Sequence, residues 1–270
     1  MRTNAIKALW AAGKPVINGW LSIGNAFSAE IMARQGFDSL TVDLQHGVVD
    51  YGAMVHIFQA LGAADTVPLA RIPALGANEV TRALDAGAMG VICPLVNTRA
   101  DAEAFVSYMR YPPEGIRSFG PTRAAVALGP GYDGNASDKL VCLAMVETAE
   151  AMSNLDAICG TPGLDGVYVG PSDLTLALTG RRFRTGFDRE EPEMIEAIRR
   201  ICDTAHRHGI KACLHTGSAP YAVRGLEWGF DLVTAATDVR LLASGAAETI
   251  EAVRAGIEAG PRDGGERAAG

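Results

Sequence analysis

The chain has 270 residues, a formal net charge of −7 and a hydrophobic fraction of 48%. This length fits one large domain or two small ones, and the hydrophobic fraction is too high for a disordered chain. No apolar run approaches the roughly 18 residues of a membrane span, and the first residues lack the apolar segment of a signal peptide. The acidic balance argues against nucleic acid as a partner. We therefore expect a globular, cytoplasmic protein with neither a membrane nor a nucleic acid as its partner.

The sequence has an odd number of cysteines, five. No two of them form a C-x-x-C pair, and most lie inside apolar runs. Free cysteine is among the most buried residue types, and disulfides are rare in the cytoplasm. We expect reduced, buried thiols, with a nucleophilic cysteine as the minor alternative, at Cys93, Cys142, Cys159, Cys202 and Cys213.

Short apolar runs alternate with longer segments of helical periodicity along the chain. The run Leu140–Val146 has seven apolar residues in succession, which is typical of a strand buried on both faces of a parallel sheet. Strands are predicted over 16–21, 39–43, 66–71, 89–93, 140–146, 166–169, 210–214 and 230–235. Helices are predicted over about 28–35, 51–61, 78–86, 99–108, around 152–159, over 194–205 and around 250–257.

Eight strand–helix units in a chain of this length average about 33 residues each, the size of a βαβ repeat. This arithmetic favours a closed (β/α)8 TIM barrel in the α/β class. A doubly wound sheet is the alternative, but the segment after the first strand lacks G-x-G-x-x-G, and no P-loop is present. We expect a single barrel domain over 1–259 and a flexible tail over 260–270.

Two connections, 110–139 and 179–191, exceed ordinary loop length and are candidate walls of a site. The second contains three arginines within Arg181–Arg184. A solvated loop, a subunit contact and a carboxylate clamp all remain possible for this cluster.

In a TIM barrel the site lies at the carboxyl ends of the strands. Polar residues that follow the apolar run of each predicted strand are therefore the candidates, whatever their type. They are Asp43, Gln45, His46, Arg71, Glu147, Asp173 and His215.

Glu147 and Asp173 follow consecutive strands, so their carboxylates can converge above the barrel. Two carboxylates suit a hard divalent cation that keeps open positions for water and substrate. The structural alternatives are a helix N-cap for Asp173 and a first-turn acid beside a helix dipole for Glu147.

Arg71 ends an apolar strand, so its guanidinium is expected to point into the barrel mouth, where it can bind a substrate carboxylate bidentately. The alternative is a salt bridge, for example to Asp85. His46 lies on a turn before Gly47, and Asp43 three residues earlier can orient its imidazole as a general base.

At this point the sequence resembles the HpcH/HpaI family of metal-dependent (class II) pyruvate aldolases. The resemblance runs from about Gly13 to Ala255. It is carried by Asp43-Leu44-Gln45-His46-Gly47, Ala70-Arg71, Tyr111-Pro112-Pro113-Glu114-Gly115-Ile116-Arg117, Val146-Glu147-Thr148 and Val169-Gly170-Pro171-Ser172-Asp173-Leu174.

The resemblance implies a TIM barrel that assembles as a homohexamer, a trimer of dimers, with the C-terminal helix exchanged between subunits. It implies a divalent metal (Mg²⁺, Mn²⁺ or Co²⁺) held by Glu147 and Asp173, with no nucleotide and no Schiff-base lysine. The implied catalytic residues are Asp43, His46, Arg71 and Asp85, with Asp85 near the other three. The implied substrate-binding residues are Trp20, Gln45, Arg71, Gly170, Pro171, Ser172, Leu214 and His215.

The implied reaction is reversible aldol cleavage of a 4-hydroxy-2-oxo acid to an aldehyde and pyruvate or hydroxypyruvate, through a metal-stabilised enolate. Two positions depart from the family pattern: many relatives have an acid where this chain has Gln45, and apolar residues where it has His215 and Thr216. Two alternatives stay open. One is an acyl-CoA lyase of the citrate lyase β type, and the other is a non-catalytic ketoacid-binding barrel.

Overall fold

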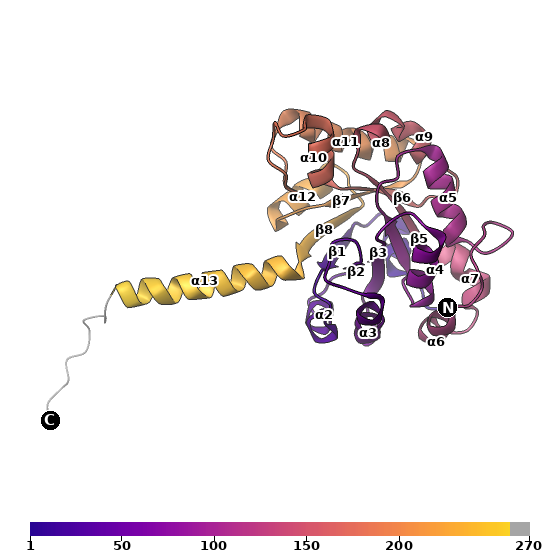
Figure 1. Ribbon diagram of the computed structural model, residues 1–270, viewed down its shortest axis with the longest axis horizontal. Coiled ribbons are helices and arrows are strands. Elements are labelled where there is room, and N and C mark those ends of the chain that lie inside the picture. The colour runs from indigo at the N-terminus through magenta and orange to yellow at the C-terminus, as the bar shows by residue number, and fades with distance from the viewer. Residues whose placement is uncertain (260–270) are drawn as a thin grey trace, which may run out of the picture. The chain divides into compact units, whose positions relative to one another are not determined.

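The computed structural model describes residues 1–259, so the predicted tail 260–270 lies outside the described residues. Eight parallel strands pair in sequence order, and β8 pairs with β1 to close the barrel. The prediction of a (β/α)8 barrel is thereby confirmed, and helices surround the strands in Figure 1. The strands are β1 Val16–Leu21, β2 Ser39–Asp43, β3 Val67–Arg71, β4 Gly90–Cys93, β5 Val141–Val146, β6 Gly166–Val169, β7 Lys211–His215 and β8 Leu232–Thr237.

Each predicted strand matches an observed one to within two residues, because buried parallel strands are continuous apolar runs that end at polar residues or proline. The helices are α1 Ala5–Ala11, α2 Ala26–Ala33, α3 Tyr51–Leu61, α4 Ala77–Asp85, α5 Arg99–Met109, α6 Thr122–Leu128, α7 Tyr132–Lys139, α8 Ala149–Ser153, α9 Leu155–Cys159, α10 Pro171–Thr179, α11 Pro192–Arg207, α12 Ala219–Glu227 and α13 Asp238–Glu258. The predicted ranges do not include the helices α1, α6, α7, α10 and α12. All five are short, and a helix of nine residues or fewer gives little periodic signal.

A three-residue sequence pattern, glycine–apolar–aspartate, recurs at the start of β2, β6 and β8. In each case the carboxylate accepts a hydrogen bond from a backbone N–H of the preceding strand. Asp38 binds the N–H of Ile17 at 2.8 Å, Asp165 that of Cys142 at 2.8 Å, and Asp231 that of Ala212 at 3.0 Å. The glycines have φ between 84° and 99°, a left-handed conformation that favours glycine, at Gly36, Gly163 and Gly229.

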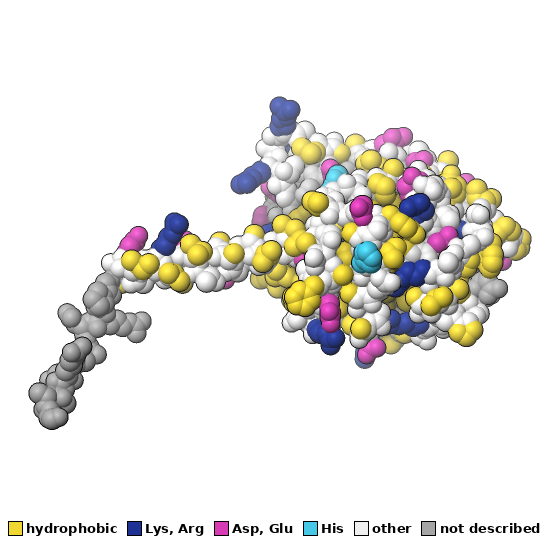
Figure 2. Space-filling model, turned by 60° about the horizontal axis from the view of Figure 1, so that its bottom comes forward, with side chains coloured by type: hydrophobic (Ala, Val, Ile, Leu, Met, Phe, Trp, Pro, Cys, Tyr) yellow, Lys and Arg dark blue, Asp and Glu magenta, His cyan; other side chains and the backbone are white. Residues whose placement is uncertain are grey.

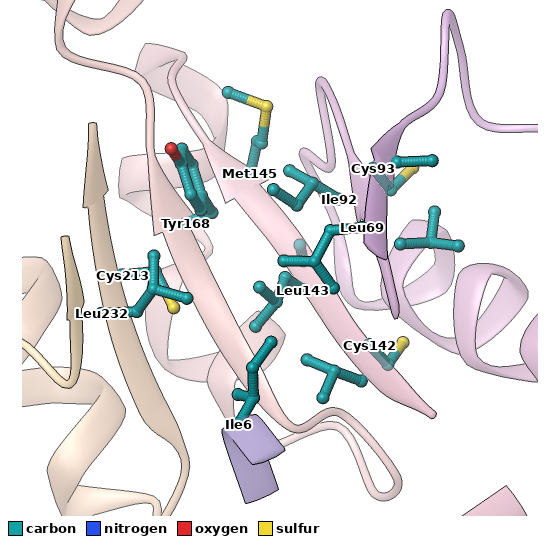
Figure 3. Packing of buried hydrophobic residues seen from close by; sticks show 14 of the residues in the cluster. Ile6, Leu69, Ile92, Cys93, Cys142, Leu143, Met145, Tyr168, Cys213 and Leu232 are labelled. Atoms are coloured by element: carbon teal, nitrogen blue, oxygen red, sulfur yellow. The ribbon is translucent and has the colours of Figure 1, made fainter. Parts of the chain in front are cut away.

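The barrel interior is filled with medium-sized apolar side chains, as Figure 3 shows for Leu69, Leu143 and Leu232. Ile6 of α1 is fully buried and lies at the end where the strands begin. Beside it, the Asn4 side chain donates to the carbonyls of Met89 and Lys139. This end of the barrel is therefore closed, and the opposite end is the one left for a site.

The chain divides into two compact units, Met1–Asp238 and a second one from Val239 onward. The first contains the whole barrel. The described part of the second is helix α13, which carries exposed apolar residues in Leu242, Val253 and Ile257, and Figure 2 shows hydrophobic side chains along it. Among residues 1–259, no helix is both long and apolar enough to cross a membrane.

Candidate active site

Asp43 and Arg71 form the centre of the polar cluster at the carboxyl ends of the strands. They are register partners on β2 and β3, and the Arg71 Nε donates to Asp43 Oδ1 at 2.8 Å while Nη2 donates to Oδ2. The Asp43 side chain is 3% exposed. Burial alone would raise the pKa of Asp43, but the hydrogen bonds and charge of Arg71 outweigh it, so the pKa is lowered below its ordinary value. The carboxylate of Asp43 is therefore ionised at neutral pH.

The remaining hydrogen bonds of Asp43 fix the turn that carries His46. Oδ1 accepts the backbone N–H groups of Gln45 and His46, at 3.0 Å and 3.2 Å. Gly47 closes the turn, because a Cβ at this position would lie 2.3 Å from the Asp43 carbonyl oxygen. We expected Asp43 to orient the imidazole of His46. It binds the backbone of that residue instead, and His46 itself is exposed.

Trp20 links this cluster to the other side of the barrel mouth. Its indole Nε1 donates to Asp43 Oδ2 at 3.1 Å, and its ring lies 4.9 Å from the Arg71 guanidinium carbon. The imidazole of His215, from β7, lies edge-on to the same indole with a centroid distance of 4.7 Å. Trp20 is only 2% exposed, so it forms the floor between Arg71 and His215.

Glu147 lies close enough to Asp173 for the charge of Asp173 to act on it. Glu147 is 3% exposed, and its Oε1 accepts the backbone N–H of Leu95 at 2.9 Å. Burial is the largest effect on Glu147 and raises its pKa. The Leu95 hydrogen bond and the charge of Arg71 lower it, and the charge of Asp173 raises it further. A buried carboxylate with a second carboxylate close by is the arrangement that a bound cation relieves.

The two structural alternatives for these carboxylates do not hold. Helix α10 begins after Gly170, and no side chain caps it, so Asp173 is an exposed residue in the first turn and not the N-cap. Glu147 precedes Thr148, the N-cap of α8, and its Oε1 is held by Leu95.

The residues present fit a divalent cation. A Cβ added at Gly170 would lie 2.5 Å from Glu147 Oε2, so glycine keeps the space beside that oxygen open. Among residues 1–259, no group of three or more His, Cys, Asp or Glu side chains is placed to hold a metal. The pair would therefore supply two protein ligands and leave positions for water and substrate.

Two predicted site residues lie elsewhere. Asp85 ends α4, and its carboxylate accepts from Arg117 Nη2 at 2.6 Å, so the structure does not bring it to the Asp43–Arg71 cluster in this chain. Leu214 lies on β7 between two inward-facing positions, and its Cδ2 is 3.1 Å from where a Cβ on Gly225 of α12 would stand. Its side chain faces the helix layer and not the barrel mouth.

The two long connections have different roles in the structure. Residues 110–139 contain α6 and α7. Arg117, which precedes α6, is buried and donates to Tyr132 of α7 and to Asp85 of α4. The segment 181–191 is bound to the β7–α12 connection, because Asp188 accepts from the N–H of Gly217 and the hydroxyl of Ser218, both at 2.6 Å. This places Phe187 against His215, with ring centroids 4.3 Å apart.

Three residues around the site gave no clear sequence signal. Leu95 has φ 54°, an unusual conformation for a residue with a side chain, and this directs its N–H toward Glu147. Tyr168 and Thr234 lie inside the strands β6 and β8, where no local pattern distinguishes them from the other strand residues. All five cysteines are free and buried, as expected, and burial raises their pKa.

The HpcH/HpaI aldolase/citrate lyase family model matches residues 17–245 of this sequence. The chain belongs to this family. The predicted resemblance is therefore confirmed, and the matched residues include all of β2 to β8 and all of β1 except Val16.

Similar proteins within the family include named enzymes. The chain is 38% identical over 252 residues to a hydroxypyruvate/pyruvate aldolase of Rhizorhabdus wittichii, covering 93% of this chain and 99% of that protein. It is 32% identical over 243 residues to a 5-keto-4-deoxy-D-glucarate aldolase of Escherichia coli, covering 89% and 93%. Among solved structures, a family member from Burkholderia cenocepacia superposes with a TM-score of 0.85 at 29% identity, covering 93% of this chain and all of that one.

Proposed function

We propose that this protein is a class II aldolase that reversibly cleaves a 4-hydroxy-2-oxo acid to an aldehyde and pyruvate or hydroxypyruvate. One observation carries the proposal. The guanidinium of Arg71, oriented by Asp43, lies close enough to the carboxylate of Glu147 for its positive charge to act on that carboxylate. A 2-oxo acid needs both kinds of group, a cation for its carboxylate and a cation-binding site beside its ketone. The similarity to the hydroxypyruvate/pyruvate aldolase supports the same reaction class.

Glu147 and Asp173 are the proposed ligands of a divalent cation, Mg²⁺, Mn²⁺ or Co²⁺. When bound, such a cation supplies Lewis-acid polarisation of the 2-oxo group. The Leu95 N–H keeps one Glu147 oxygen fixed while the other faces the space beside Gly170. The first-turn backbone of α10 at Pro171 and Ser172 is the proposed neighbour of the bound 2-oxo acid.

Arg71 is the proposed ligand of the substrate carboxylate. Two of its five N–H groups point to Asp43, which leaves three for substrate oxygens. The positive charge also offsets the negative charge that develops when C3 of the 2-oxo acid loses a proton. Trp20 supports the guanidinium from its face and excludes water from that side.

His46 is the proposed group that moves the proton at the aldehyde oxygen. During condensation a base removes a proton from C3, and the C3 carbanion attacks the aldehyde carbon. The new alkoxide takes a proton from the imidazole or from a water that it holds, and that group regains a proton from solvent, to which the base releases the C3 proton. Cleavage returns the same proton. The exposed ring on a turn fixed by Asp43 can reach an incoming aldehyde, and the neutral Gln45 beside it can offer a hydrogen bond but no charge.

We further propose a cytoplasmic homo-oligomer, with a hexamer as the expected form. Exposed apolar residues on α13, such as Leu242 and Val253, suit a helix that is exchanged with another subunit. Sedimentation of the full chain and of a Leu242→Glu/Val253→Glu variant tests this. The proposal predicts a hexamer that the double substitution dissociates, and a monomeric wild-type chain would contradict it.

The decisive experiment is a panel of aldehydes combined with pyruvate or hydroxypyruvate in the presence of added Mg²⁺, Mn²⁺ or Co²⁺. Deuterium exchange at C3 of pyruvate, without any aldehyde, reports proton removal alone. The expected result is exchange and carbon–carbon bond formation that both disappear in Arg71→Ala. Exchange at the wild-type rate in Arg71→Ala would overturn the assigned role, and cleavage of an acyl-CoA in place of a hydroxy-oxo acid would overturn the proposed function.

A further inference from the structure

A chain of buried polar side chains crosses the upper barrel interior and ends at His215. The Asn18 amide Nδ2 donates to Thr234 Oγ1 at 2.8 Å. Thr234 Oγ1 lies 2.6 Å from the Tyr168 hydroxyl, which lies 3.1 Å from His215 Nδ1. Asn18, Thr234 and Tyr168 are completely buried, and His215 is 6% exposed. Such a network is costly unless every hydrogen has an acceptor.

This requirement fixes the direction of the hydrogen bonds. The hydroxyls of Ser39 and Thr41 both donate to Asn18 Oδ1, at 2.8 Å and 3.2 Å. If the amide were reversed, these two hydroxyl hydrogens would lose the acceptor that they have among the described residues. The amide therefore gives a hydrogen to Thr234 Oγ1. Either oxygen of the Thr234–Tyr168 contact is able to donate. We infer that Thr234 donates, because the Tyr168 oxygen is the acceptor that the Thr234 hydroxyl hydrogen has among the described residues.

The direction at Thr234 then determines the tautomer of His215. Tyr168 accepts from Thr234, so its own hydrogen goes to His215 Nδ1. Burial also raises the pKa of Tyr168, which keeps the phenol protonated. Because Nδ1 accepts, the imidazole is neutral and its single hydrogen is on Nε2.

The imidazole stands beside the proposed substrate site. It packs edge-on against Trp20, whose ring also contacts the guanidinium of Arg71. Phe187 covers the imidazole from another side, and the hydrogen bond that the neighbouring Asp188 accepts from Gly217 holds Phe187 in position. His215 and Arg71 thus border the same indole, with apolar rings excluding water around the histidine.

We propose that His215 is a specificity-determining residue that donates its Nε2–H to a hydroxyl on the carbon next to a reacting carbonyl, with its tautomer set by Tyr168. This inference rests on the proposed aldolase function. Two substrates carry such a hydroxyl, a 2-hydroxyaldehyde and hydroxypyruvate. Tyr168 is a positioning residue, because it acts only through His215.

The tautomer is tested directly by two-bond ¹H–¹⁵N correlation on protein labelled with ¹⁵N-histidine, with the His215 signal assigned by its loss in His215→Gln. The Nε2–H pattern is expected in the wild type and is expected to be lost or mixed in Tyr168→Phe. An Nδ1–H pattern in the wild type would overturn the inference.

Selectivity is tested with two substrate pairs in which one member lacks the hydroxyl. The first pair is glycolaldehyde and propanal with pyruvate, where a methyl group replaces the hydroxyl. The second is hydroxypyruvate and pyruvate with one fixed aldehyde, where a hydrogen replaces it. In at least one pair, His215→Leu should reduce the preference for the hydroxylated member roughly three- to tenfold, the effect of one neutral hydrogen bond. His215→Gln, which retains an N–H donor, should recover part of it, and Tyr168→Phe should lose part of it. A merely structural role would slow both members of a pair equally and leave the ratio unchanged.

Pyruvate C3 exchange, measured on the same wild-type samples, separates the two possible failures. No exchange with any added metal would refute the proposed aldolase function itself. If exchange occurs but the selectivity ratios of both pairs are unchanged in His215→Leu, only the role of His215 is overturned. If His215→Leu does not fold, unchanged ratios in both Tyr168→Phe and His215→Gln overturn that role.

Discussion

Arg71 donates from Nε and Nη2 to the two oxygens of Asp43, its register partner on the neighbouring strand. The same carboxylate also holds the backbone of His46 and the indole of Trp20. One buried aspartate therefore positions the proposed carboxylate ligand, the turn of the proposed proton donor and the floor of the site. A buried ion pair adds little stability by itself, so its value here is in fixing the geometry.

Arg71→Lys should weaken pyruvate binding more than it slows turnover. Lysine keeps the charge but cannot form two parallel bonds to Asp43 and still present a planar face to a carboxylate. We expect KM for pyruvate to rise roughly ten- to hundredfold, the worth of a charged hydrogen bond. Initial rates over a range of pyruvate concentrations measure this, and a KM equal to that of the wild type would exclude a bidentate role.

Asp43→Asn should lower the free energy of unfolding at pH 7 by about 3–5 kcal/mol, because it leaves the charge of Arg71 buried without a partner. Since the pKa of Asp43 is lowered in the folded state, its stabilising contribution is present above the ordinary pKa of 3.8 and disappears as the pH falls through the folded value. The variant should therefore show a smaller loss of stability on acidification. Urea titrations at pH 7 and pH 3.5 test both statements, with the exposed Asp156→Asn as a control that should change little.

Glu147→Gln should make the metal-free protein more stable at neutral pH while abolishing aldol cleavage. The pKa of Glu147 is raised in the fold, first by burial, so ionisation of this group opposes folding as the pH rises through the folded value. A glutamine removes that cost and can still accept from Leu95. The melting temperature should rise by about 2–4 °C for each kcal/mol relieved. If the variant melts at a lower temperature than the wild type, with both in EDTA, ionisation of Glu147 does not oppose folding.

Chelation should abolish activity without unfolding the barrel. Glu147 and Asp173 are the only protein ligands proposed, and the hydrophobic core is separate from them, so EDTA should stop C3 exchange and cleavage while leaving the far-ultraviolet circular dichroism unchanged. Mg²⁺, Mn²⁺ or Co²⁺ should restore the rate in the wild type but not in Asp173→Asn. Full activity after exhaustive chelation, or trapping of a lysine adduct by borohydride, would contradict the proposal.

His46→Ala should slow aldol turnover by roughly two to four orders of magnitude, the range for a general acid–base group. Because Asp43 contacts the backbone of His46 and not its ring, the substitution should leave the Asp43–Arg71 pair and the melting temperature nearly unchanged. His206→Ala is the matched control, because this exposed histidine of α11 contacts Asp231, which precedes β8 at the end of the barrel opposite the site. Turnover within a factor of three of the wild type would assign the proton transfer to another group.

Much of the fold and part of the site follow from local sequence patterns. The eight strands were predicted because buried parallel strands are short apolar runs. The polar residues at or just beyond the carboxyl ends of these runs gave the candidates Asp43, Arg71, Glu147 and Asp173. Short helices such as α12 were missed because they contain too few turns to show a period. The family resemblance gave the reaction class, which residue positions alone could not.

The sequence by itself determined the order of the strands, the barrel class and which polar residues stand at the strand ends, because each of these depends on residues close together in the chain. Only the tertiary structure decided which of those residues meet. Asp43 binds Arg71 and not the imidazole of His46, Asp85 pairs with Arg117, and Leu214 faces α12. The chain of buried polar side chains from Asn18 to His215 joins four different strands. Such pairings depend on the register and closure of the barrel, which bring together side chains that are far apart in the sequence.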